Sequence, residues 1–387
     1  MLSYKLAKAH IITSISYTKC GKKSSTQTLI FSSAIDSFAK LSYNVSNDKK
    51  EVLMDIRDRE KLKRLEKTFE LNFRLTRLYA NYLEHYNEII NAEMMNALCG
   101  DGTIDEKDGF AAILCQIFGL DIDGSADERT LIRDYITPSV RVMDAERYVN
   151  NPYYKNIKIP EVKKGKWELK REKYPAYRGV IAADIAIYDN FREVPPLGFF
   201  KEEFDFPAVL EDGNEWMTLT PVDLDTSDEA IERAHGKVVT FGLGLGYYTY
   251  MVSEKEEVES ITVVEKSEDV IYLFKEYILP QFTHPEKVRI VRADAFEYAE
   301  KVIPTERFNV AFVDTWRDAS DGAPMYVKMK RLEHLSPDTE FIYWIENFLI
   351  SRLRAIRFAE IEEKLENGEE LSYGEILESL DSDNLWK

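Results

Sequence analysis

The stretch Val238-Val-Thr-Phe-Gly-Leu-Gly-Leu-Gly246 decides the fold of this chain. A short run of strand-forming residues leads directly into glycines that alternate with leucine. Such a turn is typical of α/β folds that bind a nucleotide-like ligand, because glycine lets the backbone turn sharply and approach the ligand closely. The stretch therefore predicts the first strand of a parallel sheet and a ligand-binding turn after it.

Strands and helices are expected to alternate after this turn. Apolar runs that predict strands lie at 260–265, 288–291, 308–314 and 341–345, and helical patterns separate them. Alternation at this spacing predicts the α/β class, with a Rossmann-like, doubly wound and mostly parallel sheet. Because the pattern after residue 345 is helical, we expect five strands or a sheet with a modified edge.

The residues before the glycine turn predict a small β-hairpin and one helix. Two strand patterns, 204–210 and 215–219, flank the turn sequence Glu211-Asp-Gly-Asn214. Thr226 and Glu229 have the spacing of a capping box, so we expect a helix from 227 to 234.

Carboxylates follow three of the expected strands. Glu265 ends the second strand, Asp294 follows the third and Asp314 ends the fourth. Since ligands bind beyond the carboxyl ends of parallel strands, these three side chains are the first candidates for a site. Tyr247 stands where the nicotinamide fingerprint has its third glycine, which disfavours a nucleotide-dependent oxidoreductase.

The chain from about residue 204 to 350 resembles the class I S-adenosylmethionine-dependent methyltransferases, and specifically their spermidine-synthase-like branch. Three motifs besides the glycine turn carry the resemblance: Val263-Val-Glu265-Lys266, Arg292-Ala-Asp294-Ala295-Phe296 and Phe308-Asn-Val-Ala-Phe-Val-Asp314. The hairpin upstream also occupies the place of that branch's small sheet.

The resemblance implies S-adenosylmethionine as cofactor and assigns its contacts. The methionine part would lie against Gly242, Leu243, Gly244 and Gly246. The ribose would meet Glu265, followed by Lys266, and the adenine would meet Asp294 and Ala295. Asp314 would face the cofactor and the reacting centre, where it is the candidate general base.

Three departures from the branch bear on the reaction. Thr240 replaces the acid usually found before the first glycine, and Leu245 replaces an aspartate that aminopropyltransferases use for the amine of a decarboxylated donor. Asp314 and Asp318 are also four residues apart, whereas that branch spaces its two aspartates by three. These changes favour an S-adenosylmethionine-dependent methyltransferase with an unknown acceptor. The alternatives are a spermidine-synthase-like aminopropyltransferase and a non-catalytic S-adenosylmethionine-binding or scaffold protein.

Three regions are expected along the chain. Residues 1–150 predict a mainly helical domain with a lysine-rich N-terminal arm, and this domain would supply substrate recognition or a homodimer interface. Residues 151–203 predict a connecting region of strands and loops, and residues 204–387 predict the cofactor-binding domain with an acidic helical end. The segment 155–173 interleaves basic and aromatic residues, a pattern typical of a solvated ribbon or of a surface for an anionic ligand.

Composition excludes other classes. The 387 residues contain 51 Lys+Arg and 69 Asp+Glu, a formal net charge of −18. This charge repels a phosphate backbone, so general nucleic-acid binding is not expected. No apolar run reaches the roughly 18 residues of a membrane-spanning helix, so no membrane association is expected. No histidine or cysteine spacing predicts a metal site, and the isolated cysteines and lack of a signal peptide predict a cytoplasmic protein.

Overall fold

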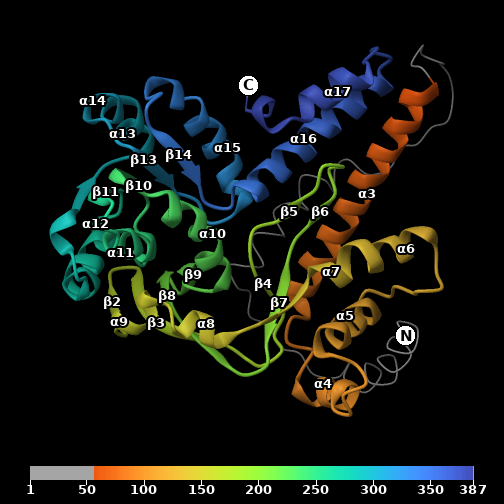
Figure 1. Ribbon diagram of the computed structural model, residues 1–387, viewed down its shortest axis with the longest axis horizontal. Helices are drawn as coiled ribbons and strands as arrows, with labels where there is room; N and C mark the ends of the chain where they lie inside the picture. The colour runs from red at the N-terminus through yellow and green to blue at the C-terminus, as the bar shows by residue number, and fades with distance from the viewer. Residues whose placement is uncertain (1–55, 387) are drawn as a thin grey trace. The chain divides into compact units, whose positions relative to one another are not determined.

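The computed structural model describes residues 56–386, which form two compact units (Figure 1). The first unit contains residues 56–141, 185–197 and 347–386, and the second contains 142–184 and 198–346. The three regions expected from the sequence are consecutive, with boundaries at 150 and 203, and these boundaries stay predictions. The predicted basic arm lies outside the described residues. No helix among the described residues is long and apolar enough to cross a membrane.

The second unit is built on a five-stranded parallel sheet of the Rossmann-like type. Its strand order is β12-β11-β10-β13-β14, which is third, second, first, fourth and fifth along this half of the chain. The strands are β10 (Gly236–Phe241), β11 (Val258–Glu265), β12 (Val288–Arg292), β13 (Val310–Val313) and β14 (Glu340–Tyr343). The predicted fold class and the five strands are confirmed.

Helices connect these strands. They are α10 (Pro221–Arg233), α11 (Tyr247–Ser253), α12 (Glu268–Leu273), α13 (Ala295–Lys301), α14 (Ile303–Glu306) and α15 (Ala319–Lys330). The helix predicted to start at Ser227 was placed wrongly. It begins one and a half turns earlier because Thr220 and Asp223 form the capping box, with Pro221 in the first turn.

A four-stranded antiparallel sheet precedes α10. Its order is β2-β3-β8-β9, and its strands are β2 (Val162–Lys164), β3 (Trp167–Tyr174), β8 (Phe204–Glu211) and β9 (Asn214–Thr218). The predicted hairpin is confirmed as β8 and β9. Asp212 and Gly213 both have positive φ, 51° and 79°, as a tight hairpin turn requires. Beside it lie α8 (Ala145–Val149) and α9 (Pro152–Asn156), and a further small sheet contains β1 (Val140–Met143), β7 (Leu197–Phe200) and β4 (Val180–Ile181).

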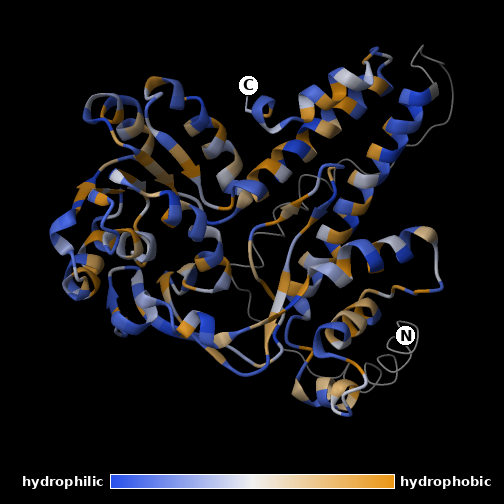
Figure 2. Ribbon diagram, in the orientation of Figure 1, coloured by the Kyte–Doolittle hydropathy of each residue, from blue (hydrophilic) through white to orange (hydrophobic). Residues whose placement is uncertain are grey.

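The first unit is mainly helical. It contains α3 (Ile56–His85), α4 (Ala92–Cys99), α5 (Glu106–Ile117), α6 (Ala126–Thr130), α7 (Thr137–Ser139), most of α16 (Glu346–Glu366) and α17 (Tyr373–Leu380), with the strand pair β5 (Ala186–Ile187) and β6 (Glu193–Val194). Figure 2 shows hydrophobic and hydrophilic residues alternating along α3 and α16, as expected of helices with one buried face.

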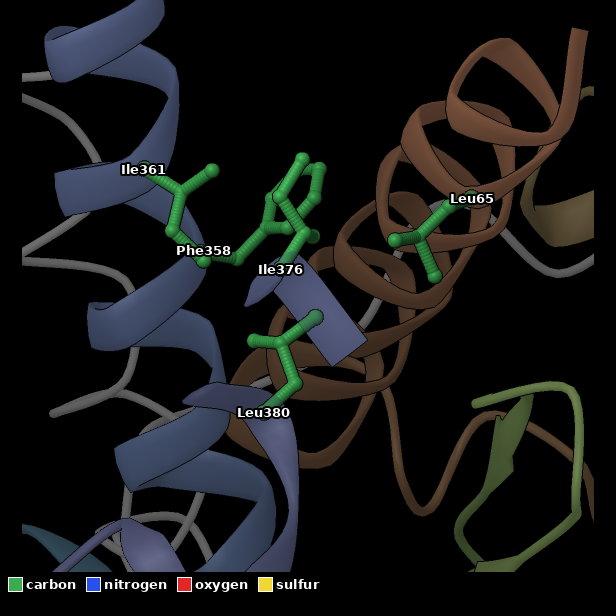
Figure 3. Close-up of a cluster of buried hydrophobic side chains, with 5 residues drawn as sticks. All are labelled: Leu65, Phe358, Ile361, Ile376 and Leu380. Atoms are coloured by element: carbon green, nitrogen blue, oxygen red, sulfur yellow. The ribbon is translucent and has the colours of Figure 1, made fainter. Parts of the chain in front are cut away.

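One apolar cluster joins the distant segments of this unit. Leu65 of α3 meets Phe358 and Ile361 of α16, and Ile376 and Leu380 of α17 (Figure 3). The acidic end of the chain is therefore packed against the helix that begins the described residues.

Polar contacts tie the strand pair into the same unit. The Asn72 side chain of α3 donates to the Phe191 carbonyl and accepts from the Glu193 amide, at 2.7 and 3.1 Å. The buried Glu193 carboxylate accepts from Ser351 at 2.6 Å and lies 3.8 Å from the Arg354 guanidinium.

Candidate functional site

The glycine turn follows β10 directly, and its conformation requires glycine. Gly242, Gly244 and Gly246 have φ values of 95°, 49° and 73°, all in the left-handed region. A Cβ at Gly242 would lie 1.9 Å from the backbone carbonyl oxygen of Asp314. The turn can therefore lie this close to the end of β13 only without a side chain at residue 242.

The other two glycines meet side chains of the protein itself. A Cβ at Gly244 would lie 1.9 Å from the Met217 sulfur, and one at Gly246 would lie 2.3 Å from the Phe274 ring. The two leucines of the turn, Leu243 and Leu245, are both buried. The Leu243 carbonyl accepts the Gly246 amide at 2.7 Å, which closes the turn before α11 begins.

Glu265 lies at the end of β11, beside the glycine turn. Its carboxylate accepts the Ser267 amide at 2.7 Å. Burial raises the pKa of Glu265, and the backbone amides of Ser267, Leu243 and Lys266 act in the opposite direction by stabilising the charge. Glu265 thus connects the end of the second strand to the turn after the first. Lys266 is exposed.

Asp294 has a structural role that is visible in the sequence only in retrospect. It is the N-cap of α13, and its Oδ1 accepts the amides of Phe296 and Glu297 at 2.9 and 3.1 Å. Its side chain is exposed, and Ala295 begins the helix. Oδ2 takes no part in this cap.

Asp314 follows β13, and the charges of two other carboxyl groups act on it. Burial raises its pKa to about 8, and the negative charges of Asp223 and Glu265 add to the rise. Asp223 lies at the start of α10, where burial raises its pKa to about 7 although the Thr220 hydroxyl and amide donate to it at 2.7 and 2.8 Å. The charges of Glu265 and Asp223 thus act on Asp314, and these three residues are called the acidic cluster below.

Asp223 was missed by the sequence prediction. The signal was present, because Thr220-Pro-Val-Asp223 has the spacing of a capping box with proline in the first turn. The pattern at Thr226 and Glu229 has the same spacing, and for this reason the sequence predicts a helix start at residue 227.

Two buried polar atoms next to Asp314 have no hydrogen-bond partner within the described residues. They are the Thr315 hydroxyl oxygen and the Trp316 indole nitrogen. Trp316 is stacked on Tyr343 of β14, with ring centroids 6.4 Å apart. An unpaired buried donor or acceptor is costly, so these atoms mark a place where a polar group of a ligand would be stabilised.

The basic residues of β3 and its turn face acids. Cross-strand pairs join Lys166 to Glu211 and Arg171 to Asp205, and Lys173 lies 2.9 Å from Glu203. Lys170 pairs with Glu172 on its own strand. This neutralisation favours the solvated-ribbon interpretation of segment 155–173 over a surface for an anionic ligand.

His235 and His334 lie exposed at the ends of short segments. The His235 and His334 rings contact the carbonyls of Arg233 and Arg331, at 2.9 and 2.8 Å. Within residues 56–386, no group of three His, Cys, Asp or Glu side chains is placed to hold a metal ion.

Comparisons with known proteins add little to this geometry. No family model matches the chain, and no curated protein matches it. Among solved structures it is similar to a spermidine synthase in complex with the transition-state analogue AdoDATO, with a TM-score of 0.30, 16% identity and 41% of this chain covered. A spermidine synthase from Thermotoga maritima gives a TM-score of 0.29, 17% identity and the same coverage.

The matched part spans 59% and 60% of the length of those two chains. At this level of similarity, the assignment of the fold depends on the parallel pairing and the strand order of the protein's own sheet.

Proposed function

We propose that the protein is a group transferase that uses S-adenosylmethionine, and that it transfers the methyl group to an acceptor not yet identified. The observation that carries the proposal is the acidic cluster of Asp223, Glu265 and Asp314 beside the glycine turn. The sulfonium of this donor is positively charged, so it is stabilised where carboxyl groups gather and water is partly excluded.

The residues of the turn fit the donor in the following way. The three glycines give the turn a left-handed conformation that residues with a side chain rarely adopt, and the methionine part would lie against the backbone atoms of this turn. Glu265 accepts the Ser267 amide at 2.7 Å, and the Leu243 and Lys266 amides also stabilise its charge. A carboxylate has about four acceptor positions, so it retains capacity for a ribose hydroxyl. Asp294 uses Oδ1 for its helix, which leaves Oδ2 for the adenine amino group.

Orphaned atoms beside the cluster provide a separate test of fit. The Thr315 hydroxyl and the Trp316 indole N–H are buried without partners in the described part of the chain. A polar ligand at the end of β13 could form hydrogen bonds with both atoms. Apolar surroundings would leave both without a hydrogen-bond partner. The residues present are therefore compatible with a bound polar cofactor.

The donor supplies an electrophilic methyl group when it is bound. The protein then has to align donor and acceptor and hold the proton that the acceptor loses. A group with a pKa near the working pH is the best proton acceptor, and the Asp314 carboxyl has a pKa of about 8. Asp314 is therefore the proposed general base, and burial, together with the charges of Asp223 and Glu265, keeps its pKa raised.

Aminopropyl transfer is the second candidate, and the same acidic cluster favours it. A decarboxylated donor lacks the carboxylate but keeps the amine, so it carries more net positive charge, which three carboxyl groups would attract. Leu245 disfavours aminopropyl transfer. Its fully buried apolar side chain stands at the sequence position where aminopropyltransferases have the aspartate that holds the amine. A protein that binds the donor without turnover is the third candidate.

Calorimetry with S-adenosylmethionine and with its decarboxylated form tests the proposal. We expect the intact chain to bind S-adenosylmethionine more tightly, and Glu265→Gln to weaken binding by about tenfold, since it removes a charged hydrogen-bond acceptor. Glu268→Gln, at an exposed position one turn further on, is the matched control. Absence of binding at millimolar donor contradicts the proposal.

Labelled donor then distinguishes the three candidates. Cell extract incubated with the protein and methyl-labelled S-adenosylmethionine should yield a methylated compound. Transfer only from decarboxylated donor labelled in the aminopropyl chain would establish the second candidate. Binding without transfer of either group would establish the third.

A further inference from the structure

The backbone N–H and the backbone carbonyl of Leu245 each form a hydrogen bond with a side chain that belongs to neither β10 nor α11. Its N–H donates to the Met217 sulfur of β9 at 3.3 Å. Its carbonyl accepts the Tyr153 hydroxyl of α9 at 2.5 Å. Leu245 lies between two glycines of the turn, so these contacts act at the middle of the proposed donor-binding loop.

Tyr153 is fixed in its position by α11, the helix that follows the turn. The Tyr153 ring is completely buried and meets the rings of Tyr247 and Tyr250 edge-on, with centroid distances of 5.7 and 5.6 Å. On either side of it, Asn151 donates to the Tyr247 hydroxyl at 3.0 Å and Asn156 donates to the Tyr250 hydroxyl at 2.7 Å. The segment 151–156 is thus attached to the first helical turn after the glycines.

Met217 lies against the turn from the opposite element. Its sulfur occupies the position next to Gly244 where any Cβ would clash, at 1.9 Å. It is half-buried in β9, a strand that pairs with β8 and not with the parallel sheet. The thioether is a weak hydrogen-bond acceptor, and here it is the acceptor for the Leu245 amide.

These contacts restrict a turn that is otherwise free to change. Glycines flank Leu245 on both sides, and glycine populates positive and negative φ with similar ease. Rotation of the Gly244–Leu245 or Leu245–Gly246 peptide would redirect an N–H or a carbonyl at the donor site. Such a rotation has to break the Met217 contact in the first case and the Tyr153 contact in the second.

We propose that Tyr153 and Met217 are positioning residues that hold the Leu245 peptide and thereby set the affinity of the glycine turn for the donor. This inference rests on the proposed function for the identity of its ligand. Whether Met217 holds the Leu245 amide can be measured on the protein without any ligand. It assigns a role in the donor site to α9, which lies outside the part of the chain that resembles methyltransferases.

Tyr153→Phe is the first test, and Tyr154→Phe is its matched control. Both substitutions remove one hydroxyl from α9, but the Tyr154 hydroxyl donates to the carbonyl of Leu219, which is not a residue of the turn. We expect Tyr153→Phe to weaken binding of S-adenosylmethionine in calorimetry by about fivefold, the factor of one ordinary hydrogen bond. Tyr154→Phe should bind as the unchanged protein does. Equal donor affinity in the two variants would overturn the proposal.

Met217→Leu is the second test, because it keeps the volume and removes the sulfur acceptor. Exchange of the Leu245 amide with deuterium, measured by NMR on the full chain without ligand, should become about fivefold faster. Met329→Leu, a fully buried methionine in α15, is the control and should leave Leu245 unchanged. Unchanged exchange at Leu245 in Met217→Leu would overturn the proposal.

The two readouts separate this inference from the proposed function. If the unchanged protein does not bind S-adenosylmethionine, the proposed function fails, and faster exchange at Leu245 still supports the positioning role. If the donor binds but neither variant changes affinity or exchange, only the positioning role fails.

Discussion

The Asp314 carboxyl makes stability depend on pH in a direction opposite to that of most surface acids. Its pKa in the folded protein is about 8, against 3.8 for an ordinary aspartate. Between these values the folded protein binds a proton that the unfolded chain has lost, so the free energy of unfolding falls as the pH rises. The loss begins above about pH 4 and is complete above about pH 8.

Asp314→Asn should remove this dependence. We expect the variant to be more stable than the unchanged protein at pH 8.5 by on the order of 2 kcal/mol, with little difference at pH 4. Urea unfolding across this range measures it, and the exposed Asp338→Asn is the control. A difference that does not grow with pH would show that the Asp314 carboxyl is not buried as described.

Gly242 is the residue at which substitution should cost most within the turn. Alanine there would combine a φ of 95° with a Cβ placed 1.9 Å from a backbone oxygen that cannot move aside. We expect Gly242→Ala to reduce the free energy of unfolding by about 3 kcal/mol or more. Gly213→Ala has a φ of 79° and no atom within 4 Å of the added Cβ, so about 1 kcal/mol is expected for strain alone. Equal unfolding midpoints would contradict the close approach to β13.

Which residues the sequence could reveal depended on local pattern. The glycine turn, Glu265 and Asp314 lie next to strands, and parallel strands bring their ends together whatever the rest of the chain does. Tyr153 and Met217 reach the same place through contacts between distant segments, which no local spacing records. The local spacing of Asp223 predicts a helix start but not its effect on Asp314. The donor contacts proposed for Asp294 and Ala295 stay predictions.

At the level of elements, α13 offers a way to separate two roles of one side chain. Asp294→Ala removes the acceptor for two free amides, so it should destabilise the protein by about 1 kcal/mol. Asp294→Asn retains a good N-cap without the charge and should change stability by only a few tenths of a kcal/mol. Urea unfolding measures both, with the exposed Glu300→Ala as a control within the helix. Equal losses for Asn and Ala would mean that the cap contributes little.

The start of α10 shows why element boundaries are harder to predict than elements. Thr220 with Asp223 and Thr226 with Glu229 offer the same capping pattern six residues apart. The first is used because the helix then buries Val222 and Leu224, and because Pro221 suits a first turn. Burial of this kind depends on partners that the local sequence does not name.

At the level of the whole molecule, the sequence did not predict which segments form the first unit, because they are far apart along the chain. Its helical character was evident from the apolar spacing in α3, which includes Leu65 and Leu75. Its partners were not, because an apolar stripe on a helix fits any other apolar stripe. The structure assembles the unit from three separated segments, and Asn72 and Glu193 provide the polar contacts between two of them.

The cluster around Ile376 is where this assembly can be tested. Ile376 is fully buried among Leu65, Phe358, Ile361 and Leu380, so Ile376→Ala should reduce the free energy of unfolding of the first unit by about 3 kcal/mol. The exposed Glu378→Ala on the same helix is the control.

Hydrogen exchange shows where the loss occurs. Amides of α3 and α16 should exchange faster in Ile376→Ala, because their apolar faces share the cavity, while amides of β10 and β13 should keep their protection, because the parallel sheet has its own core. If only α17 loses protection, then the last helix rests on the unit without completing its core. If β10 loses protection as much as α3, then the two compact units unfold as one cooperative body.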